Sequence, residues 1–305
     1  MTNAPSIPWR PEVVFGFADE RAQAQTLAAK LNAAYAEIEV HQFPDQELKV
    51  RVPVQAACAV IYRPLHHPNA KLIEVLLAAG ALRDMGCRDI ALIAPYLPYM
   101  RQDIAFQPGE AVSQRIIGGM LTQAFDRFVA VDPHLHRTPT LEAVFGGKPA
   151  LALSGAAAIA KHMAAADLGN TLVLGPDEES APLVRRIAEP LRLDWTTGLK
   201  QRFGDHDVRI TLPESVGWTK RPVVIADDVI SSGGTAVALV NLLRERGAGP
   251  IDVYATHALF GDTVHDALLE AGVRRIVSCD GIPHRTNAMS VVDVIVEGVA
   301  AWRSR

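Results

Sequence analysis

Residues 223–235 combine two kinds of side chain that suit a phosphorylated sugar. The β-branched apolar run 223–226 predicts a buried strand, and it ends in Asp227 and Asp228. The small residues 231–235 (Ser-Ser-Gly-Gly-Thr) then open an apolar helix, which gathers backbone N–H groups and hydroxyls at a helix N-terminus. Such a point binds an anion, whereas the acids suit sugar hydroxyls or a hydrated magnesium ion. The pattern therefore predicts a sugar phosphate, with its phosphate on the loop and its hydroxyls on the aspartates.

Cationic side chains elsewhere in the chain suit polyphosphate. Arg101 and Gln102 follow a predicted strand, 90–94, and a tight loop rich in proline and tyrosine. A guanidinium there can bind polyphosphate oxygens through two parallel hydrogen bonds. Lys200 and Arg202 lie two residues apart in a segment predicted to be extended, so their side chains point to the same side. Paired cations of this kind can stabilise phosphoryl charge, but a Lys-x-Arg pair is equally common as a solvated feature of a surface loop.

Short apolar strands alternate with helices along the chain. In the first half we predict strands at 13–17, 59–62, 90–94 and 128–131, and helices at 20–32, 70–84 and 113–125. In the second half we predict strands at 171–174, 223–226, 251–256 and 275–278, and helices at 154–166, 180–189, 235–246 and 263–271. This alternation predicts parallel sheets that are covered by helices on both faces. Ligands of such folds bind at the carboxyl ends of the strands, where the residues described above fall.

The turn-rich stretch 146–149 (Gly-Gly-Lys-Pro) predicts a boundary between two α/β domains, 1–148 and 149–305. The 305 residues suit two domains of roughly 150 residues each better than one domain. The two halves repeat the same plan of elements, although no sequence repeat recurs at a fixed period.

Composition narrows the class of protein. Lys and Arg number 30 and Asp and Glu 34, and the resulting net charge of −4 argues against a nucleic-acid-binding surface. The three cysteines are widely separated, without metal-binding spacing, which is typical of buried thiols in a reducing compartment. The first residues do not form a signal peptide, and no stretch approaches the ~20 apolar residues that span a bilayer. We therefore expect a soluble, cytoplasmic protein without a nucleic-acid or membrane partner.

A series of motifs along residues 43–283 resembles those of the ribose-phosphate pyrophosphokinases, or phosphoribosyl pyrophosphate (PRPP) synthetases. The motifs are Phe43-Pro44-Asp45-Gln46-Glu47, 95–103 with its continuation to 113, Asp132-Pro133-His134, Pro176-Asp177, Lys200-Gln201-Arg202 and the loop 227–235. The last of these also resembles the phosphoribosyl-binding loop of type I phosphoribosyltransferases. The forms of 106–113 and 230–235 resemble the archaeal-type synthetases more than the typical bacterial ones.

The resemblance implies an α/β fold of two tandem phosphoribosyltransferase-like domains, each a parallel sheet flanked by helices. The N-terminal domain would carry ATP-binding elements, and the C-terminal domain the ribose 5-phosphate loop and a catalytic flexible loop. The implied activity transfers the β,γ-diphosphoryl group of ATP to the C1 hydroxyl of ribose 5-phosphate, giving PRPP and AMP, with Mg2+ as cofactor. The implied partners are these two substrates and further copies of the chain, in a homo-oligomer (dimer or higher) whose subunits share the ATP site.

The resemblance also implies a role for individual residues. For ATP binding it implies Phe43, Asp45, Glu47, Arg101, Gln102 and Asp103. For ribose 5-phosphate binding it implies Asp177, Asp227, Asp228, Ser231, Ser232, Gly233, Gly234 and Thr235. For catalysis it implies Lys200, Arg202 and Arg101, and for metal binding His134 and Asp177.

Two places depart from the family's pattern. Glu178 and Glu179 follow Asp177 where relatives usually have small residues, and we interpret them as ordinary acids of a first helical turn. Ser231 stands where typical bacterial synthetases have Asp. These departures keep open a synthetase-like regulatory protein that has lost catalysis, although the intact Lys200, Arg202, Arg101 and His134 argue against it. A phosphoribosyltransferase that consumes PRPP is a second alternative, because it shares the loop 227–235, but it has no need of the segments around Phe43 and Arg101.

Overall fold

The computed structural model describes residues 9–135, 137–202 and 208–303, with the backbone alone at 200–202, 208, 209, 301 and 303. The chain forms two compact units, Met1–Leu153 with Val292–Arg305 (unit 1) and Ser154–Val291 (unit 2). The units differ from the expected domains 1–148 and 149–305 at both ends of the second domain. Strand β8 (Ala150–Leu153) pairs with its neighbour in unit 1, and helix α9 (Val292–Arg303) packs on α1 of the same unit. The C-terminal helix therefore returns to the first unit.

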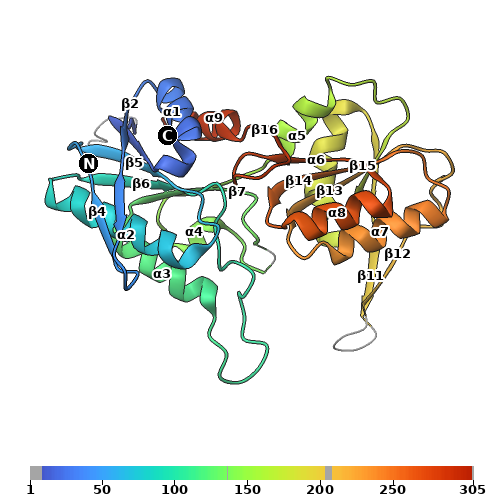
Figure 1. Ribbon diagram of the computed structural model, residues 1–305, viewed down its shortest axis with the longest axis horizontal. Coiled ribbons are helices and arrows are strands. Elements are labelled where there is room, and N and C mark those ends of the chain that lie inside the picture. The colour runs from blue at the N-terminus through green and yellow to red at the C-terminus, as the bar shows by residue number, and fades with distance from the viewer. Residues whose placement is uncertain (1–8, 136, 203–207, 304–305) are drawn as a thin grey trace, which may run out of the picture. The chain divides into compact units, whose positions relative to one another are not determined.

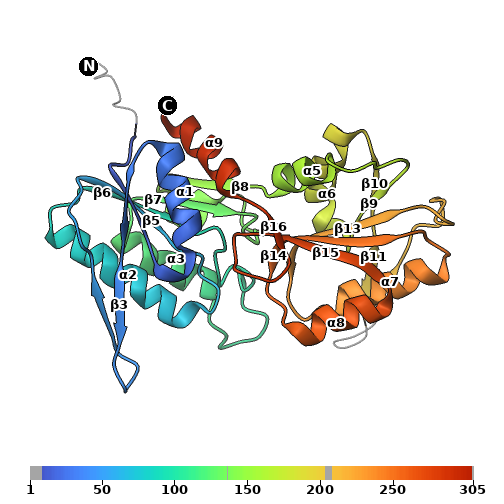
Figure 2. The ribbon, with the colours of Figure 1, turned by 45° about the horizontal axis from the view of Figure 1, so that its top comes forward.

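Unit 1 is built on a six-stranded parallel sheet in the order β2-β1-β5-β6-β7-β8. Its other strands are β1 (Val13–Gly16), β2 (Ala34–Glu37), β5 (Cys58–Tyr62), β6 (Asp89–Ile93) and β7 (Arg127–Val131). Helices α1 (Arg21–Leu31) and α9 cover one face, and α2 (Pro68–Asp84), α3 (Ser113–Ala124) and α4 (Leu141–Val144) cover the other (Figures 1 and 2). A hairpin, β3 (Glu39–Gln42) with β4 (Leu48–Arg51), projects from this unit (Figure 2).

Unit 2 has a second six-stranded parallel sheet, in the order β10-β9-β13-β14-β15-β16. The strands are β9 (Leu172–Gly175), β10 (Asp194–Thr197), β13 (Val223–Ile230), β14 (Ile251–Ala258), β15 (Val273–Cys279) and β16 (Asn287–Met289). Helices α5 (Ala156–Met163) and α6 (Ala181–Leu191) lie on one face, and α7 (Gly234–Glu245) and α8 (Asp262–Ala271) on the other (Figure 1). The hairpin of this unit is β11 (Leu199–Arg202) with β12 (Val208–Thr211).

The two units repeat one plan. In each, the first strand leads through a short 3-10 turn, η1 (Ala18–Glu20) or η2 (Glu178–Ser180), into a helix and an outer strand. The hairpin comes next, and a central strand and its helix follow. The α/β class with two parallel sheets flanked by helices is thus confirmed. Because β1 and β5 stand in unit 1 where β9 and β13 stand in unit 2, positions in the two units can be compared.

Apolar runs form the strands because both faces of each sheet are covered. All eight residues of β14 are buried, as are all four of β9. Strand β13 is longer than the predicted 223–226, since Asp227 and Val229 still pair with residues of β14. The two acids therefore lie inside the strand and not after it, which corrects the sequence prediction.

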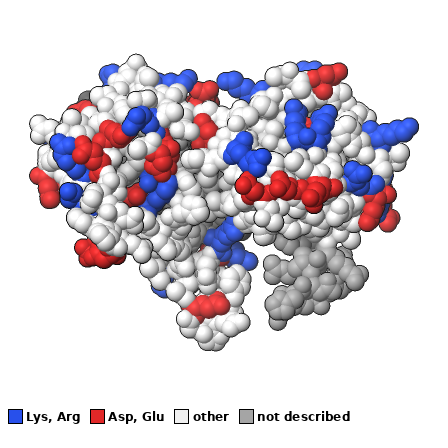
Figure 3. Space-filling model, in the orientation of Figure 1, with Lys and Arg blue, Asp and Glu red and all other residues white. Residues whose placement is uncertain are grey.

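The surface carries both signs of charge. Figure 3 shows Lys and Arg side chains interspersed with Asp and Glu side chains on the face in view, without a continuous basic area. Among the helices of the described residues, none combines the length and the apolar character that crossing a membrane requires.

Candidate functional site

Three acidic residues meet at the carboxyl edge of the unit 2 sheet. Asp177 comes two residues after β9, and Asp227 and Asp228 lie in the second half of β13, the neighbouring strand. Because the carboxyl ends of parallel strands share one edge, the chain brings these side chains together. The acids predicted to bind ribose 5-phosphate therefore lie at the edge where open α/β sheets bind ligands.

Asp177 shapes the turn that follows β9. Its carboxylate caps η2 by accepting a hydrogen bond from the backbone N–H of Glu179 at 3.1 Å. The hydroxyl of Ser180 donates to the carbonyl oxygen of Asp177 at 2.5 Å. Glu178 and Glu179 are exposed in the first turn of η2, in agreement with their interpretation as first-turn acids.

Asp227 and Asp228 are arranged as neighbouring acids. The Asp227 carboxylate accepts from the N–H of Asp228 at 3.0 Å, and the Asp228 carboxylate accepts from the N–H of Val229 at 2.8 Å. Burial raises the pKa of Asp227 well above its usual value, and the charges of Asp228 and Asp177 add to that effect. No Lys or Arg among the described residues forms an ion pair with Asp227. This acid is thus suited to a ligand that brings hydroxyl donors or a cation.

The loop 231–235 leads into α7 as predicted for an anion site. Among the described residues, no side-chain hydrogen bond caps the first turn of α7, so its N–H groups are available to a ligand. Within the described residues, the hydroxyls of Ser231, Ser232 and Thr235 have no hydrogen-bond partner. The cap residue Gly233 has φ +73°, and a Cβ there would lie 2.2 Å from Cγ1 of Val264. Only glycine fits this position without displacement.

In unit 1, the loop after β6 presents Arg101 to solvent. The Arg101 side chain is exposed, and within the described residues it makes no ion pair. The loop is folded by Glu110, whose carboxylate accepts from the N–H groups of Phe106 and Gln107 at 2.8 and 3.2 Å. The same carboxylate accepts from the Gln102 side chain at 3.3 Å. Arg101 therefore stands free on an ordered loop.

Asp103 has a partner that the sequence did not indicate. Its side chain is only 4% exposed, and its carboxylate accepts from the Arg137 guanidinium at 2.9 Å. That guanidinium also lies over the ring of Phe106, 5.7 Å from its centroid. Asp103 therefore orients Arg137, while its predicted contact with ATP stays a prediction. No motif singled out Arg137, because one arginine in a polar loop gives no signal.

Phe43, Asp45 and Glu47 lie at the tip of the β3–β4 hairpin. The Phe43 ring is 40% exposed and makes an edge contact with the His41 ring at 4.8 Å. The turn is closed because the N–H of Phe43 donates to the Glu47 carbonyl at 2.8 Å. Asp45 accepts from the N–H of Glu47 at 3.2 Å. An exposed ring beside two carboxylates can stack on a base and accept from its amino group.

For the predicted catalytic residues on β11 and the predicted metal ligands, the structure gives the element or the unit but not the site. Lys200 and Arg202 both lie on β11, but their side chains fall outside the described part of the structure. His134 is half-buried in the loop after β7 in unit 1, whereas Asp177 belongs to unit 2. Their shared role as metal ligands stays a prediction.

The acids at the unit 2 edge offer carboxylate oxygens, which are the ligand atoms that magnesium prefers. Within the described residues, no group of three or more His, Cys, Asp or Glu side chains is placed to hold a metal ion. Magnesium, however, is often bound through one or two carboxylates, with water and substrate phosphates as its other ligands. The oxygen atoms of Asp177, Asp227 and Asp228 fit that kind of site.

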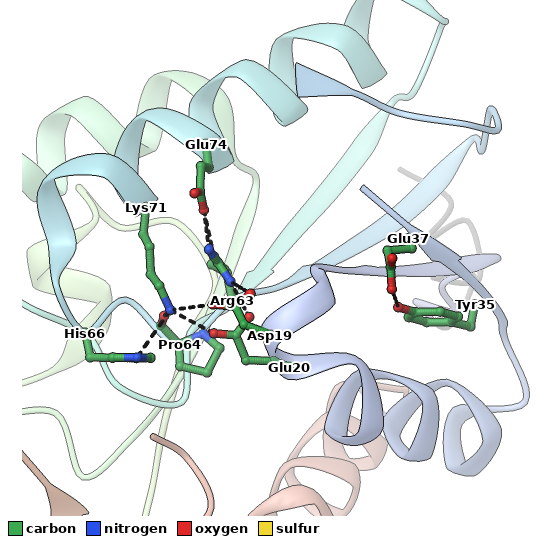
Figure 4. A network of polar contacts seen from close by, with 9 residues as sticks. All are labelled: Asp19, Glu20, Tyr35, Glu37, Arg63, Pro64, His66, Lys71 and Glu74. Carbon is green, nitrogen blue, oxygen red and sulfur yellow. Dashed lines mark hydrogen bonds and ion pairs between the residues drawn. The ribbon is translucent and has the colours of Figure 1, made fainter. Parts of the chain in front are cut away.

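The corresponding edge of unit 1 holds a buried ion cluster that the sequence did not reveal. Arg63 follows β5 and forms ion pairs with Asp19, Glu20 and Glu74 (Figure 4). Lys71 also pairs with Glu20, at 2.8 Å. Arg63 is 4% exposed and Glu20 1%. We call these five residues the Arg63 cluster.

Burial decides the protonation of two groups at this edge. It raises the pKa of Glu20 to about 7, although the opposing charge of Arg63 lowers it. It lowers the pKa of His66, which lies against Lys71, to about 4, and the Lys71 charge acts in the same direction. At neutral pH, His66 is therefore uncharged and the cluster balances its charges internally.

Comparisons with known proteins agree with the motifs. A family model described as the N-terminal domain of ribose phosphate pyrophosphokinase matches residues 13–124. The ribose-phosphate pyrophosphokinase of Methanopyrus kandleri is 33% identical over 276 residues, which cover 90% of this chain and 93% of that protein. That of Pyrococcus abyssi is 35% identical over 261 residues, 85% of this chain and 89% of its own.

A solved structure shares the fold. The crystal structure of phosphoribosylpyrophosphate synthetase from Mycobacterium smegmatis matches with a TM-score of 0.80. The match covers 95% of this chain and 98% of that chain, at 23% sequence identity. The arrangement of two parallel sheets is thus shared with a protein of distant sequence.

Proposed function

The chain belongs to the ribose-phosphate pyrophosphokinase family, and we infer that it transfers the β,γ-diphosphoryl group of ATP to the C1 hydroxyl of ribose 5-phosphate. In this reaction the sugar oxygen forms a bond to the β-phosphorus, the bond from the β-phosphorus to the α,β-bridging oxygen breaks, and AMP leaves. The C1 hydroxyl proton is released, and PRPP is formed.

The observation that carries this proposal is the open anion site beside the acids of unit 2. The uncapped N–H groups of α7 and the hydroxyls of Ser231, Ser232 and Thr235 would hold the 5-phosphate. Gly233 and Gly234 bring the backbone close to the phosphate, since neither carries a side chain. Asp227 and Asp228 would accept hydrogen bonds from the ribose hydroxyls.

Mg2+ fits the proposed site as a substrate-bound cofactor. It would be held by Asp177, with Asp227 and Asp228 beside it, together with phosphate oxygens, and when bound it would neutralise charge on the transferring group. A cation at this edge would also stabilise the ionised form of Asp227, whose pKa is raised without one.

Nucleotide binding is assigned to unit 1. We expect Phe43 to stack on the adenine, and Asp45 and Glu47 to accept from its amino group or from the ribose. Arg101, with Gln102 and Asp103 beside it, would bind the polyphosphate. Lys200 and Arg202 would stabilise the negative charge that develops on the phosphoryl oxygens. No general base is required, because phosphoryl transfer depends mainly on positioning and electrostatics.

We further infer that the protein acts as a homo-oligomer in the cytoplasm. The Phe43 tip is exposed on a hairpin, so that a second copy of the chain could receive it in a shared ATP site. Cys58, Cys87 and Cys279 all lie in the described part of the chain and form no disulfide, as is usual for proteins of a reducing compartment.

Product analysis tests the reaction. Purified protein is incubated with ATP, Mg2+ and ribose 5-phosphate, and AMP and PRPP are quantified together. Equal amounts of AMP and PRPP support the proposal. Release of ADP means transfer of the γ-phosphoryl group alone, and consumption of PRPP with a base means a phosphoribosyltransferase. Ligand binding without turnover means a regulatory protein.

Lys200→Ala tests the cationic hairpin within the same assay. We expect turnover to fall by roughly 100-fold or more while ATP binding persists, because the lysine acts on charge that develops in the transition state. Lys161→Ala is the matched control, since Lys161 is exposed on α5 at the end of the helix. Equal turnover of the two variants would remove Lys200 from the catalytic set.

A further inference from the structure

The Arg101 loop contains a residue in an unfavourable backbone conformation. Tyr99 has φ +64°, in the left-handed region that residues other than glycine adopt only under constraint. Its hydroxyl donates a hydrogen bond to Oδ1 of Asn69 at 2.5 Å. Tyr99 precedes Arg101 by two residues, so its backbone angles set the direction in which the chain enters that arginine.

Asn69 is a firm acceptor because its helix is fixed at the same end. It lies in the first turn of α2, two residues before Lys71. Lys71 is 8% exposed, and its ammonium pairs with Glu20 and donates to the Pro64 carbonyl at 3.3 Å. One turn further on, Glu74 pairs with Arg63 (Figure 4). The Arg63 cluster thus anchors the turn of α2 that receives the Tyr99 hydroxyl.

The backbone on both sides of Tyr99 is also anchored. The N–H of Leu65 donates to the Tyr96 carbonyl at 3.0 Å, which joins the loop after β5 to the loop after β6. Leu97 and Met100 are 5% and 2% exposed and pack in the core of unit 1. Arg101, the next residue, is exposed. The anchored backbone therefore extends as far as Met100, and the exposed Arg101 follows it directly.

We propose that Tyr99 and Asn69 are positioning residues for ATP: their hydrogen bond holds the loop in the conformation that presents Arg101 to the polyphosphate. This role rests on the proposed function, in which Arg101 binds ATP. Loss of the hydroxyl removes a contact that opposes relaxation of Tyr99 toward negative φ, and such relaxation changes the direction of the chain at Met100 and Arg101. The ribose 5-phosphate residues belong to unit 2 and are not touched by this change.

Tyr99→Phe removes one oxygen atom and tests the proposal. We expect the KM for ATP to rise about three- to tenfold, as the loss of one hydrogen bond allows, with an unchanged KM for ribose 5-phosphate. The dissociation constant of Mg·ATP alone, measured by calorimetry, should rise by the same factor. Tyr35→Phe is the matched control, because the Tyr35 hydroxyl bonds a carboxylate of Glu37 at 3.1 Å in the same unit, on β2.

Variants of the acceptor separate positioning from simple stabilisation. Asn69→Asp keeps an acceptor oxygen and should retain the wild-type KM for ATP, whereas Asn69→Leu should reproduce Tyr99→Phe. The double variant Tyr99→Phe/Asn69→Leu should be no worse than either single variant, because both remove the same interaction. Thermal unfolding of each variant confirms that it is folded.

The outcomes are separable from the proposed function. An unchanged ATP affinity in Tyr99→Phe, an equal rise in Tyr35→Phe, or additive effects in the double variant would overturn the positioning role. A wild-type protein that binds ATP without forming AMP and PRPP contradicts the proposed reaction, while the calorimetric comparison still decides the role of Tyr99. A wild-type protein that does not bind ATP overturns both.

Discussion

The carboxyl edges of the two parallel sheets carry different sets of charged residues. Where β1 and β5 end, Arg63 is buried and pairs with the buried acids Glu20 and Glu74. Where β9 and β13 end, Asp227 has no cationic partner among the described residues, and the loop before α7 leaves its N–H groups and hydroxyls open. The charges of one edge are paired within the chain, and the other is the edge at which we propose that ribose 5-phosphate binds.

The correspondence extends to single positions. Counted from the first pair that each central strand makes with its neighbour, Arg63 in unit 1 stands at the strand position of Asp227 in unit 2. The helices that follow both begin after a left-handed residue, His67 with φ 53° and Gly233 with φ 73°. A cation in unit 1 and an acid in unit 2 therefore occupy the same strand position, at the buried ion cluster and at the proposed binding edge respectively.

The largest effect is expected from Arg63→Ala. The change leaves three acids, Asp19, Glu20 and Glu74, at a largely buried site without their main cation. Breaking a buried ion cluster in this way should lower the free energy of unfolding by about 4 kcal/mol. Urea unfolding followed by circular dichroism measures the change.

Arg21→Ala is the control for Arg63→Ala. Arg21 pairs with Glu37 at 2.5 Å in the same unit, but its side chain is 55% exposed, so its removal should change stability far less than Arg63→Ala does. If the two variants lose similar stability, the Arg63 cluster does not hold unit 1 together.

Asp227→Asn is the counterpart at the open edge, and it should separate activity from stability. We expect turnover to fall by about 100-fold, because a charged acceptor for the ribose hydroxyls is lost. The midpoint of thermal unfolding at pH 7.5 should stay equal or rise, since the ionised acid is disfavoured in the fold. The Asn oxygen still accepts from the N–H of Asp228.

Asp252→Asn should give the reverse result in the same unit. Asp252 is 2% exposed near the start of β14, away from the proposed site, and accepts from Arg274 and Arg275 at 2.7 and 2.9 Å. It should lose stability and keep its turnover. If Asp227→Asn and Asp252→Asn each lost activity in proportion to stability, Asp227 would have no role in activity separate from folding.

The sequence predicts the parts of this comparison that depend on local pattern. The buried strands were located because apolar runs such as 223–226 and 251–256 are continuous, and the acids and small residues of unit 2 lie together in one segment. The outer strand β2 and the hairpin strand β3 were not predicted, because each is only four residues long and lacks a continuous apolar run.

Contacts between distant segments were beyond the reach of the sequence. Glu20 and Arg63 lie 43 residues apart, and Asp103 and Arg137 lie 34 apart. A single charge in a loop has the same local signature whether it is solvated or buried, so only the fold distinguishes the two cases. The return of α9 to unit 1 likewise brings together distant residues, as in the ion pair of Lys30 with Asp293 at 2.9 Å.

The free energy of unfolding of unit 1 should depend only weakly on pH, because Glu20 and His66 contribute to it in opposite directions. Glu20 has a pKa near 7 in the fold against 4.5 unperturbed, so its stabilising effect is complete below 4.5 and is lost as the pH rises through 7. His66 has a pKa near 4 in the fold against 6.5, so its effect is complete above 6.5 and is lost as the pH falls through 4. Between these limits the two contributions cancel in part.

Single replacements should reveal each slope. With His66→Gln, the free energy of unfolding should fall by about 2 kcal/mol between pH 4.5 and 7.5, since Glu20 then acts without opposition. With Glu20→Gln it should rise over the same interval, by less, because His66 is only half-buried. Urea unfolding at half-unit steps of pH measures both slopes. Identical profiles for the two variants would mean that other groups control the pH dependence.

The smallest effects are expected from replacing His67 and Gly233, the residues with positive φ that precede α2 and α7. Gly233→Ala adds a Cβ that would lie 2.2 Å from Cγ1 of Val264, so the loop must shift, and the KM for ribose 5-phosphate should rise about tenfold. His67→Gly relieves a strained φ at the corresponding cap but also increases the entropy of the unfolded chain, so stability should change by less than about 1 kcal/mol. Both KM values should stay unchanged in His67→Gly. Steady-state kinetics of the two variants decides whether the residue before the helix contributes to substrate binding in unit 2 alone. An increase in either KM on replacing His67 would mean that the edge of unit 1 also contacts a substrate. The contrast between the two edges would then be wrong.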